Sequence, residues 1–174
     1  MSNASATSEG QRPARARGRE LALWILCHLE SHAGSEREAV ELFWREAPTL
    51  DAGDDFLTPN GPQLEALLAD SAAKRWARAL TASYLDALEQ TDAALESASK
   101  RWRVARMDRV DRNLLRLCAV ELGAHDTPRN VVVSEVVRLA ARYGSERSSA
   151  FVNGVAEALA RALRDGAGDG ESGS

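Results

Sequence analysis

Apolar residues recur every three or four positions along most of this 174-residue chain, and no segment alternates apolar and polar residues as a half-buried strand does. Val131–Val133 alone has the composition of a strand, but Val136 and Ala140 continue a helical spacing beyond it. The sequence therefore predicts an all-α fold. The positions expected to face its core include Leu26, Trp76, Leu80, Leu114, Val136 and Ala162.

Prolines, glycines and capping residues divide this pattern into about seven helices. Three helix starts carry a specific signal: Ser35 with Glu38 and Asp108 with Asp111 have capping-box spacing, and Thr127 precedes Pro128 as a cap precedes the first helical residue. The predicted helices are Arg15–Ser31, Ser35 to about Ala47, one or two helices from Gln63 to about Ser99 with a break near Thr91, Asp108–Gly123, Thr127–Gly144, and a last helix from Ser145 or Ser148. Pro48–Pro62 is predicted to be a loop.

The two ends of the chain differ from its middle. Residues 1–11 have no apolar period and are predicted to be disordered, and residues 165–174 form an acidic Gly/Ser tail of the same character. The remaining residues, 12–164, are expected to form one domain. Two cysteines do not make a disulfide framework, and no apolar stretch approaches the ~20 residues of a membrane span, so we expect a cytoplasmic protein without membrane contact.

Positive charge is concentrated in two segments of a chain whose formal net charge is −4. Arg12–Arg19 carries +4, and Lys100–Arg116 carries seven basic residues against two aspartates. Cations at the start of a helix oppose its dipole, which indicates a reason for the first cluster other than helix stability. A segregated positive field favours a polyanionic partner, although a solvated basic surface is the alternative.

The residues offer no catalytic constellation. The sequence has no phosphate-binding glycine loop, no GxSxG and no HExxH. Cys27, His28 and His32 come closest to a metal site, but the ligand set is incomplete, and packing of Cys27 in the core explains it better. We expect no enzymatic activity, no metal and no cofactor.

The C-terminal half, "RMDRVDRNLLRLCAVELGAHDTPRNVVVSEVVRLAARYGSERSSAFVNGVAEALA", resembles the NusB family of bacterial transcription antitermination factors. "DR..LR", "D.P" and "FVNGV" carry the resemblance, and an arginine-rich opening agrees with it. The matching residues include Asp111, Arg112, Leu115, Arg116, Glu121, Asp126, Pro128, Glu135, Phe151, Val152, Asn153, Gly154 and Val155, with Arg15, Arg19, Glu20, Ala22 and Leu26 in the opening.

The resemblance implies a bundle of two three-helix lobes and a function without catalysis. NusB proteins bind boxA RNA of nascent transcripts, chiefly ribosomal RNA leaders, together with the small-subunit ribosomal protein NusE. The complex joins other Nus factors on RNA polymerase and keeps it processive through terminators. For the chain by itself, a homodimer stays open as an alternative.

Single-stranded RNA is bound by cations along its phosphates and by aromatic or guanidinium planes against its bases. On this basis we expect RNA contacts from the first helix and from the region of the "FVNGV" motif, and a weaker contribution of Glu135 to the partner surface. The expected RNA-binding residues are Arg12, Arg15, Arg17, Arg19, Arg147, Phe151 and Asn153. Core packing of Phe151 and a helix contact of Asn153 are the alternatives, and Gly154 is expected at a close helix contact.

One departure from the family concerns stacking: Cys27 stands where many relatives have an aromatic, with Trp24 a turn earlier. Other functions stay in competition. A complete RNA methyltransferase with a NusB-like domain is excluded, because no residues remain for a cofactor-binding domain. A helical DNA-binding regulator and a helical protein-interaction module without boxA specificity are the alternatives.

Overall fold

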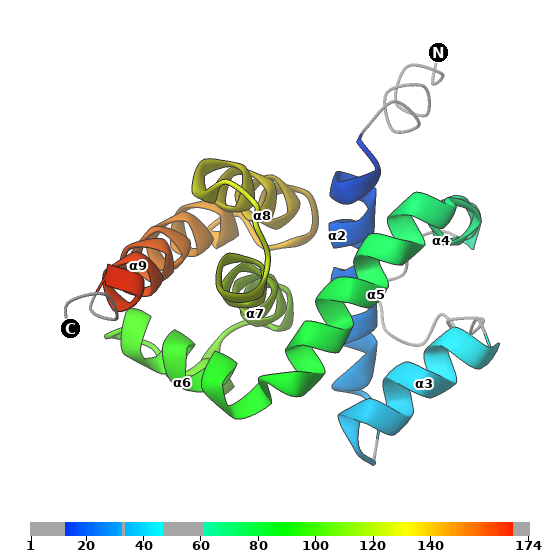
Figure 1. The fold of residues 1–174 in the computed structure, drawn as a ribbon, viewed down its shortest axis with the longest axis horizontal. Coiled ribbons are helices and arrows are strands. Elements are labelled where there is room, and N and C mark those ends of the chain that lie inside the picture. The colour runs from blue at the N-terminus through cyan, green and yellow to red at the C-terminus, as the bar shows by residue number, and fades with distance from the viewer. Residues whose placement is uncertain (1–12, 33, 47–60, 169–174) are drawn as a thin grey trace, which may run out of the picture.

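The computed structural model describes residues 13–32, 34–46 and 61–168 (Figure 1). These residues form eight α-helices and one short 3-10 helix, with no strand among them, which confirms the predicted all-α fold. The elements are α2 (Ala14–Leu29), α3 (Glu36–Glu46), α4 (Gly61–Ala69), α5 (Ser71–Asp86), α6 (Leu88–Ala98), η1 (Val104–Arg106), α7 (Arg109–Ala124), α8 (Arg129–Tyr143) and α9 (Ser148–Gly168).

The helices form two groups, and α2 of the first group packs against α7 of the second. α5 packs along α2, with α3 and α4 beside them, while α6, α8 and α9 surround α7 (Figure 1). The resemblance implies three helices in each group, whereas each group has four. The additional ones are the short helices α4 in the first group and α6 in the second, both of which are separate from α5.

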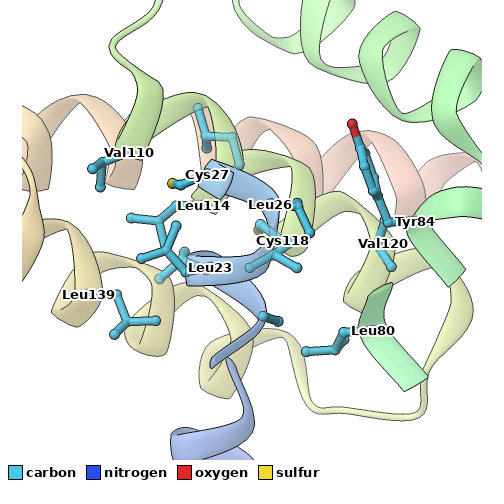
Figure 2. Close-up of a cluster of buried hydrophobic side chains, with 14 of the residues drawn as sticks. Leu23, Leu26, Cys27, Leu80, Tyr84, Val110, Leu114, Cys118, Val120 and Leu139 are labelled. Carbon is cyan, nitrogen blue, oxygen red and sulfur yellow. The ribbon is translucent and has the colours of Figure 1, made fainter. Parts of the chain in front are cut away.

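One hydrophobic core joins the two groups. Figure 2 shows Leu23 of α2, Leu80 of α5, Leu114 of α7 and Leu139 of α8 pointing toward one another, and each of these side chains is fully buried. Cys27 and Cys118 belong to the same core, where burial raises the pKa of both thiols to about 12. Of the predicted core positions, Trp76 is only partly buried and Ala162 is exposed.

The predicted helix break near Thr91 is wrong. The region divides at Asp70 and at Ala87, while Thr91 is buried in α6. Asp70 starts α5, because its Oδ1 accepts hydrogen bonds from the N–H groups of Ala72 (2.9 Å) and Ala73 (3.1 Å). The apolar spacing runs on through both breaks, so periodicity alone does not reveal them.

The three predicted caps have different outcomes. Asp108 is the N-cap residue of α7, as predicted, but its side chain makes no capping bond, and Asp111 is buried. Burial raises the pKa of Asp111, a hydrogen bond with Ser148 opposes that shift, and the charge of Asp108 adds to it. Pro128, not Thr127, is the N-cap of α8. Ser35 behaves as predicted, since its Oγ accepts the N–H of Glu38 at 3.3 Å.

Other boundaries lie near their predicted positions. Gly144 ends α8 as expected, and a Cβ there would lie 2.7 Å from the carbonyl oxygen of Ala140, so the tight turn into α9 requires glycine. α7 ends one residue beyond Gly123. α9 continues to Gly168, so residues 165–168 are helical rather than part of the predicted tail.

Part of the predicted loop is helical, because α4 begins at Gly61. The remaining residues of this predicted loop, 48–60, lie outside the described residues, as do residues 1–11 and 169–174 of the predicted disordered ends. Within the described ranges, no helix combines the length and the apolar character needed to cross a membrane.

Candidate nucleic-acid interface

Arg15 is the exposed cation of the first helix, and an aromatic side chain holds it. Its guanidinium carbon lies 4.3 Å from the centre of the Trp76 ring, which comes from α5. The Trp76 ring in turn meets His125 edge-on, with 4.9 Å between ring centroids, and Nε2 of His125 lies 3.0 Å from Oγ of Ser83. Two side chains of α5 and the residue that follows α7 thus form the surroundings of one exposed guanidinium, which lies over the indole.

Arg17 has a partner at the junction of α4 and α5. Its Nη2 lies 2.9 Å from Oδ2 of Asp70, the residue that caps α5. The hydrogen bond from the backbone of Ala73 is the main reason that the pKa of Asp70 is lowered, and the positive charge of Arg17 acts in the same direction. Arg17 is part-exposed, so it combines a structural contact with a position at the surface.

Arg19 does not reach the surface. Only 4% of its side chain is exposed, and it donates two hydrogen bonds to Glu121 of α7, at 2.7 Å and 2.6 Å. Nη1 also lies 3.8 Å from the carboxylate of Glu135 on α8. The expected RNA contact of Arg19 is therefore incompatible with its burial: the residue forms an ion pair in the core. Arg12 lies outside the described residues.

The second expected region begins where α8 passes into α9. The Tyr143 ring packs edge-on against Trp24 of α2 at 5.0 Å, and its hydroxyl donates to the carboxylate of Glu20, so the end of α8 lies against α2. Arg147 is exposed in the connection that follows. This connection therefore lies beside the first helix, although on a different side of α2 from Arg15 and Trp76.

Within α9, Phe151 and Asn153 differ in exposure. Phe151 is half-buried and packs against the core, whereas Asn153 is exposed. No interaction that the structure shows for Arg15 or Arg17 involves either residue. Gly154 is exposed, and a Cβ there would meet nothing within 4 Å, so the expected close helix contact at Gly154 is wrong.

Comparison with known proteins connects this geometry to a family. The sequence profile of the NusB family matches residues 16–161. The transcription antitermination protein NusB of Sorangium cellulosum (strain So ce56) is 39% identical over 151 residues, covering 86% of this chain and 94% of that protein. Its counterpart in Myxococcus xanthus (strain DK1622) is 37% identical over 151 residues, covering 86% and 96%. The chain belongs to the NusB family.

A solved structure agrees with this assignment. NusB of T. maritima has a TM-score of 0.64 and 28% sequence identity, and the match covers 86% of this chain and 92% of that one. The family resemblance of the "DR..LR" and "FVNGV" motifs is thus confirmed, and so is the helical fold that it implies.

Trp24 and Cys27 of α2 do not provide a stacking surface in this NusB chain. Each is only 3% exposed, so neither takes the place of the aromatic that the resemblance implies at this turn. Trp76 and His125 are the functional candidates that the sequence analysis missed. The sequence around Trp76, "KRWAR", interleaves cations with an aromatic and could have indicated the site.

Glu135 and the three residues that came closest to a metal site, Cys27, His28 and His32, contact other residues of the NusB fold. Glu135 is half-buried and lies 3.2 Å from Nη2 of Arg138, in addition to its contact with Arg19. The rings of His28 and His32 lie 4.1 Å apart, but Cys27 points into the core and contacts Asn113 instead. In the described part of the chain, no group of three or more His, Cys, Asp or Glu side chains is placed to hold a metal ion.

Proposed function

We propose that this NusB-family protein is a transcription antitermination factor that binds boxA-type single-stranded RNA in nascent ribosomal transcripts. Its partner in this role is the small-subunit ribosomal protein NusE, and the complex joins other Nus factors on RNA polymerase and supports processive transcription. Family membership and the antitermination role in the relatives' names support this proposal. NusB proteins are transcription factors, and the sequence offers no motif for catalysis.

One observation carries the RNA-binding part of the proposal: the exposed guanidinium of Arg15 lies over the Trp76 ring. A guanidinium plane stacks against bases and donates hydrogen bonds to phosphates. Because Trp76 already orders the arginine, less side-chain entropy is lost when RNA binds. Arg17 and Arg147 extend the positive surface, and the exposed amide of Asn153 offers donors and an acceptor for a base edge.

The direct test is the affinity for a short boxA-type RNA, measured with and without NusE across a salt series. Affinity should fall as salt rises, and the heterodimer should bind more tightly than the NusB chain alone. Arg15→Ala should weaken binding by about fivefold or more and lower the salt dependence by about one phosphate contact. Arg161→Ala, which removes an exposed arginine of α9, is the matched control and should leave the affinity unchanged.

A second substitution tests the stacked geometry rather than the charge. Trp76→Leu keeps Arg15 but removes the ring beneath it, so RNA affinity should fall while the net charge stays the same. If Arg15→Ala and Trp76→Leu both bind RNA as the wild type does, this surface has no role in binding. Equal affinity for duplex DNA would favour a DNA-binding regulator. A complex with NusE that has no affinity for the RNA would favour a protein-interaction module.

A further inference from the structure

The connection between α6 and α7 carries a cluster of cations around an exposed aromatic. This connection, Lys100–Arg106, is called the Trp102 segment below. Lys100, Arg101, Arg103 and Arg106 are all exposed, and none of them forms an ion pair with a residue that the structure describes. The nearest acids along the chain are Glu96 and Asp108, so the segment and its flanks keep a positive charge.

Trp102 is the most exposed of the large apolar side chains in the described residues, with 56% of its surface accessible. Burying a side chain of this size would contribute more free energy than burying a smaller one. Val104 of the segment and Met107 just after it nevertheless point inward, at 5% and 6% exposure, while the indole is left outside. An exposed indole flanked by exposed cations combines the two elements with which proteins bind single-stranded nucleic acid, an aromatic ring and a positive surface.

The exposure of Trp102 does not come from a loosely attached chain. The N–H of Trp102 donates to the carbonyl of Ser99 at 2.9 Å, and Oγ of Ser99 donates to the carbonyl of Trp102 at 2.9 Å. At the next turn, the N–H of Val104 donates to Oε1 of Glu96 at 3.0 Å. Arg112 closes the segment from α7, with Nη1 2.6 Å from the carbonyl oxygen of Met107. These hydrogen bonds fix the backbone on both sides of Trp102.

We propose that the Trp102 segment is a second contact surface for single-stranded RNA. One base stacks on the indole, and the flanking arginines and lysine bind phosphates on either side. Sequence-tolerant RNA binding combines these two elements, a positive surface along the backbone and an aromatic ring for a base. An acidic protein segment would also pair with the cations. Its carboxylates, however, would not explain the exposed face of the indole.

The segment contacts a different stretch of RNA from the one proposed for Arg15. Figure 1 shows α6 at the lower left and the N-terminal end of α2 in the upper middle of the view, with α7 between them. The inference rests on the proposed function, since it adds a second contact for the same transcript. It therefore predicts a dependence on RNA length, which the Arg15 surface alone does not.

The experiment compares three RNAs: a short boxA-type probe of about 12 nucleotides, and two longer probes in which about 20 unstructured nucleotides extend it at one end or at the other. The full chain with NusE is titrated with each probe. Trp102→Ala should weaken binding of an extended probe by about fivefold or more, and should leave the short probe unaffected. Trp102→Phe should retain most of the affinity, because the ring still stacks.

Charge is tested separately. The double substitution Arg101→Gln with Arg103→Gln should lower the salt dependence for the extended probe by about one to two phosphate contacts. Arg37→Gln with Arg161→Gln removes two exposed arginines that lie outside both proposed RNA contacts and is the control. Thermal unfolding should show that the Trp102 variants remain folded, since the indole is mostly outside the core.

The outcomes separate the two proposals. Loss of affinity for the extended probe alone supports the second surface. Unchanged affinity of Trp102→Ala for both extended probes overturns it while the proposed function stands. If the wild type binds neither RNA, the proposed function fails first. If Trp102→Ala reduces NusE binding but not RNA binding, the segment is a protein interface, and the RNA assignment is wrong.

Discussion

Arg15 and Arg19 are four residues apart, so they lie on the same face of α2, yet one is exposed and the other is buried. The difference is depth along the helix. Arg15 lies in the first turn, where Trp76 supports it at the edge of the bundle, whereas Arg19 lies one turn deeper, opposite Glu121 of α7. Near the N-terminal end of α2 the helix dipole disfavours a cation, and the carboxylate of Glu121 offsets this cost for Arg19.

Removal of Arg19 should be strongly destabilising. Arg19→Ala leaves Glu121, which is 1% exposed, as an uncompensated buried charge, and such losses cost about 3–5 kcal/mol. Urea denaturation at neutral pH measures the change. The control is Arg17→Ala, whose pair with Asp70 is part-exposed and should cost less than about 1 kcal/mol.

The double substitution Arg19→Met with Glu121→Met should recover most of the stability that Arg19→Ala loses, because it leaves no charge unpaired. A cost below about 1 kcal/mol for Arg19→Ala would mean that Glu121 finds another partner or is neutral in the folded chain.

At the scale of the helices, glycines with the same local conformation have opposite roles. Gly18 lies in α2 where α5 approaches, and a Cβ there would lie 2.7 Å from the carbonyl oxygen of Ala73 and 2.8 Å from Cβ of Trp76. Gly154 lies within α9 with open space around it. The first glycine permits helix packing, while the second has no packing partner among the described residues.

Alanine substitutions should therefore change stability in opposite directions. Gly154→Ala should stabilise the protein by up to about 1 kcal/mol, because alanine lowers the entropy of the unfolded chain and favours helix. Gly18→Ala should destabilise it by about 1–3 kcal/mol through overpacking between α2 and α5. Thermal and urea unfolding of the two variants provide the comparison. Equal signs for the two changes would contradict the packing that the structure shows.

At the scale of the whole molecule, Glu30 joins the two groups of helices. Just after α2, its carboxylate accepts two hydrogen bonds from Arg112 of α7, at 2.8 Å and 2.6 Å, and one each from Arg116 and Asn113 at 3.1 Å. Burial by itself raises the pKa of Glu30, but the hydrogen bonds and charge of Arg112, with help from Asn113 and Arg116, leave it lowered.

The contribution of Glu30 should depend on pH. Because its pKa is lower in the folded protein than the ordinary value of 4.5, the stabilisation is present above that value and is lost as pH falls through the folded pKa. Glu30→Gln should cost about 1 kcal/mol at neutral pH, a modest figure because the side chain is 20% exposed.

Urea midpoints of the wild type and Glu30→Gln, measured from neutral pH down to about pH 3, test this pH dependence. The two curves should converge as the carboxylate of the wild type becomes protonated. A difference that stays constant over this range would show that the ionisation of Glu30 does not contribute.

Much of the fold follows from local patterns in the sequence. The helical spacing of apolar residues predicts the helical segments of the bundle but not the breaks between α4, α5 and α6, and the "FVNGV" and "DR..LR" motifs indicate the NusB family. The candidate site follows only in part. The arginine cluster of α2 draws attention to the correct helix, but the sequence does not separate Arg15, which is exposed, from Arg19, which is buried.

By itself, the sequence determined that the chain is helical, where most helices lie and which family it belongs to, because helix formation and capping depend on residues a few positions apart. The tertiary structure alone decided which cations are available to a ligand. Glu121 lies 102 residues from Arg19, and Trp76 comes from a different helix than Arg15. Whether a long cationic side chain is buried, stacked or exposed depends on what packing places opposite it, and no local pattern encodes that.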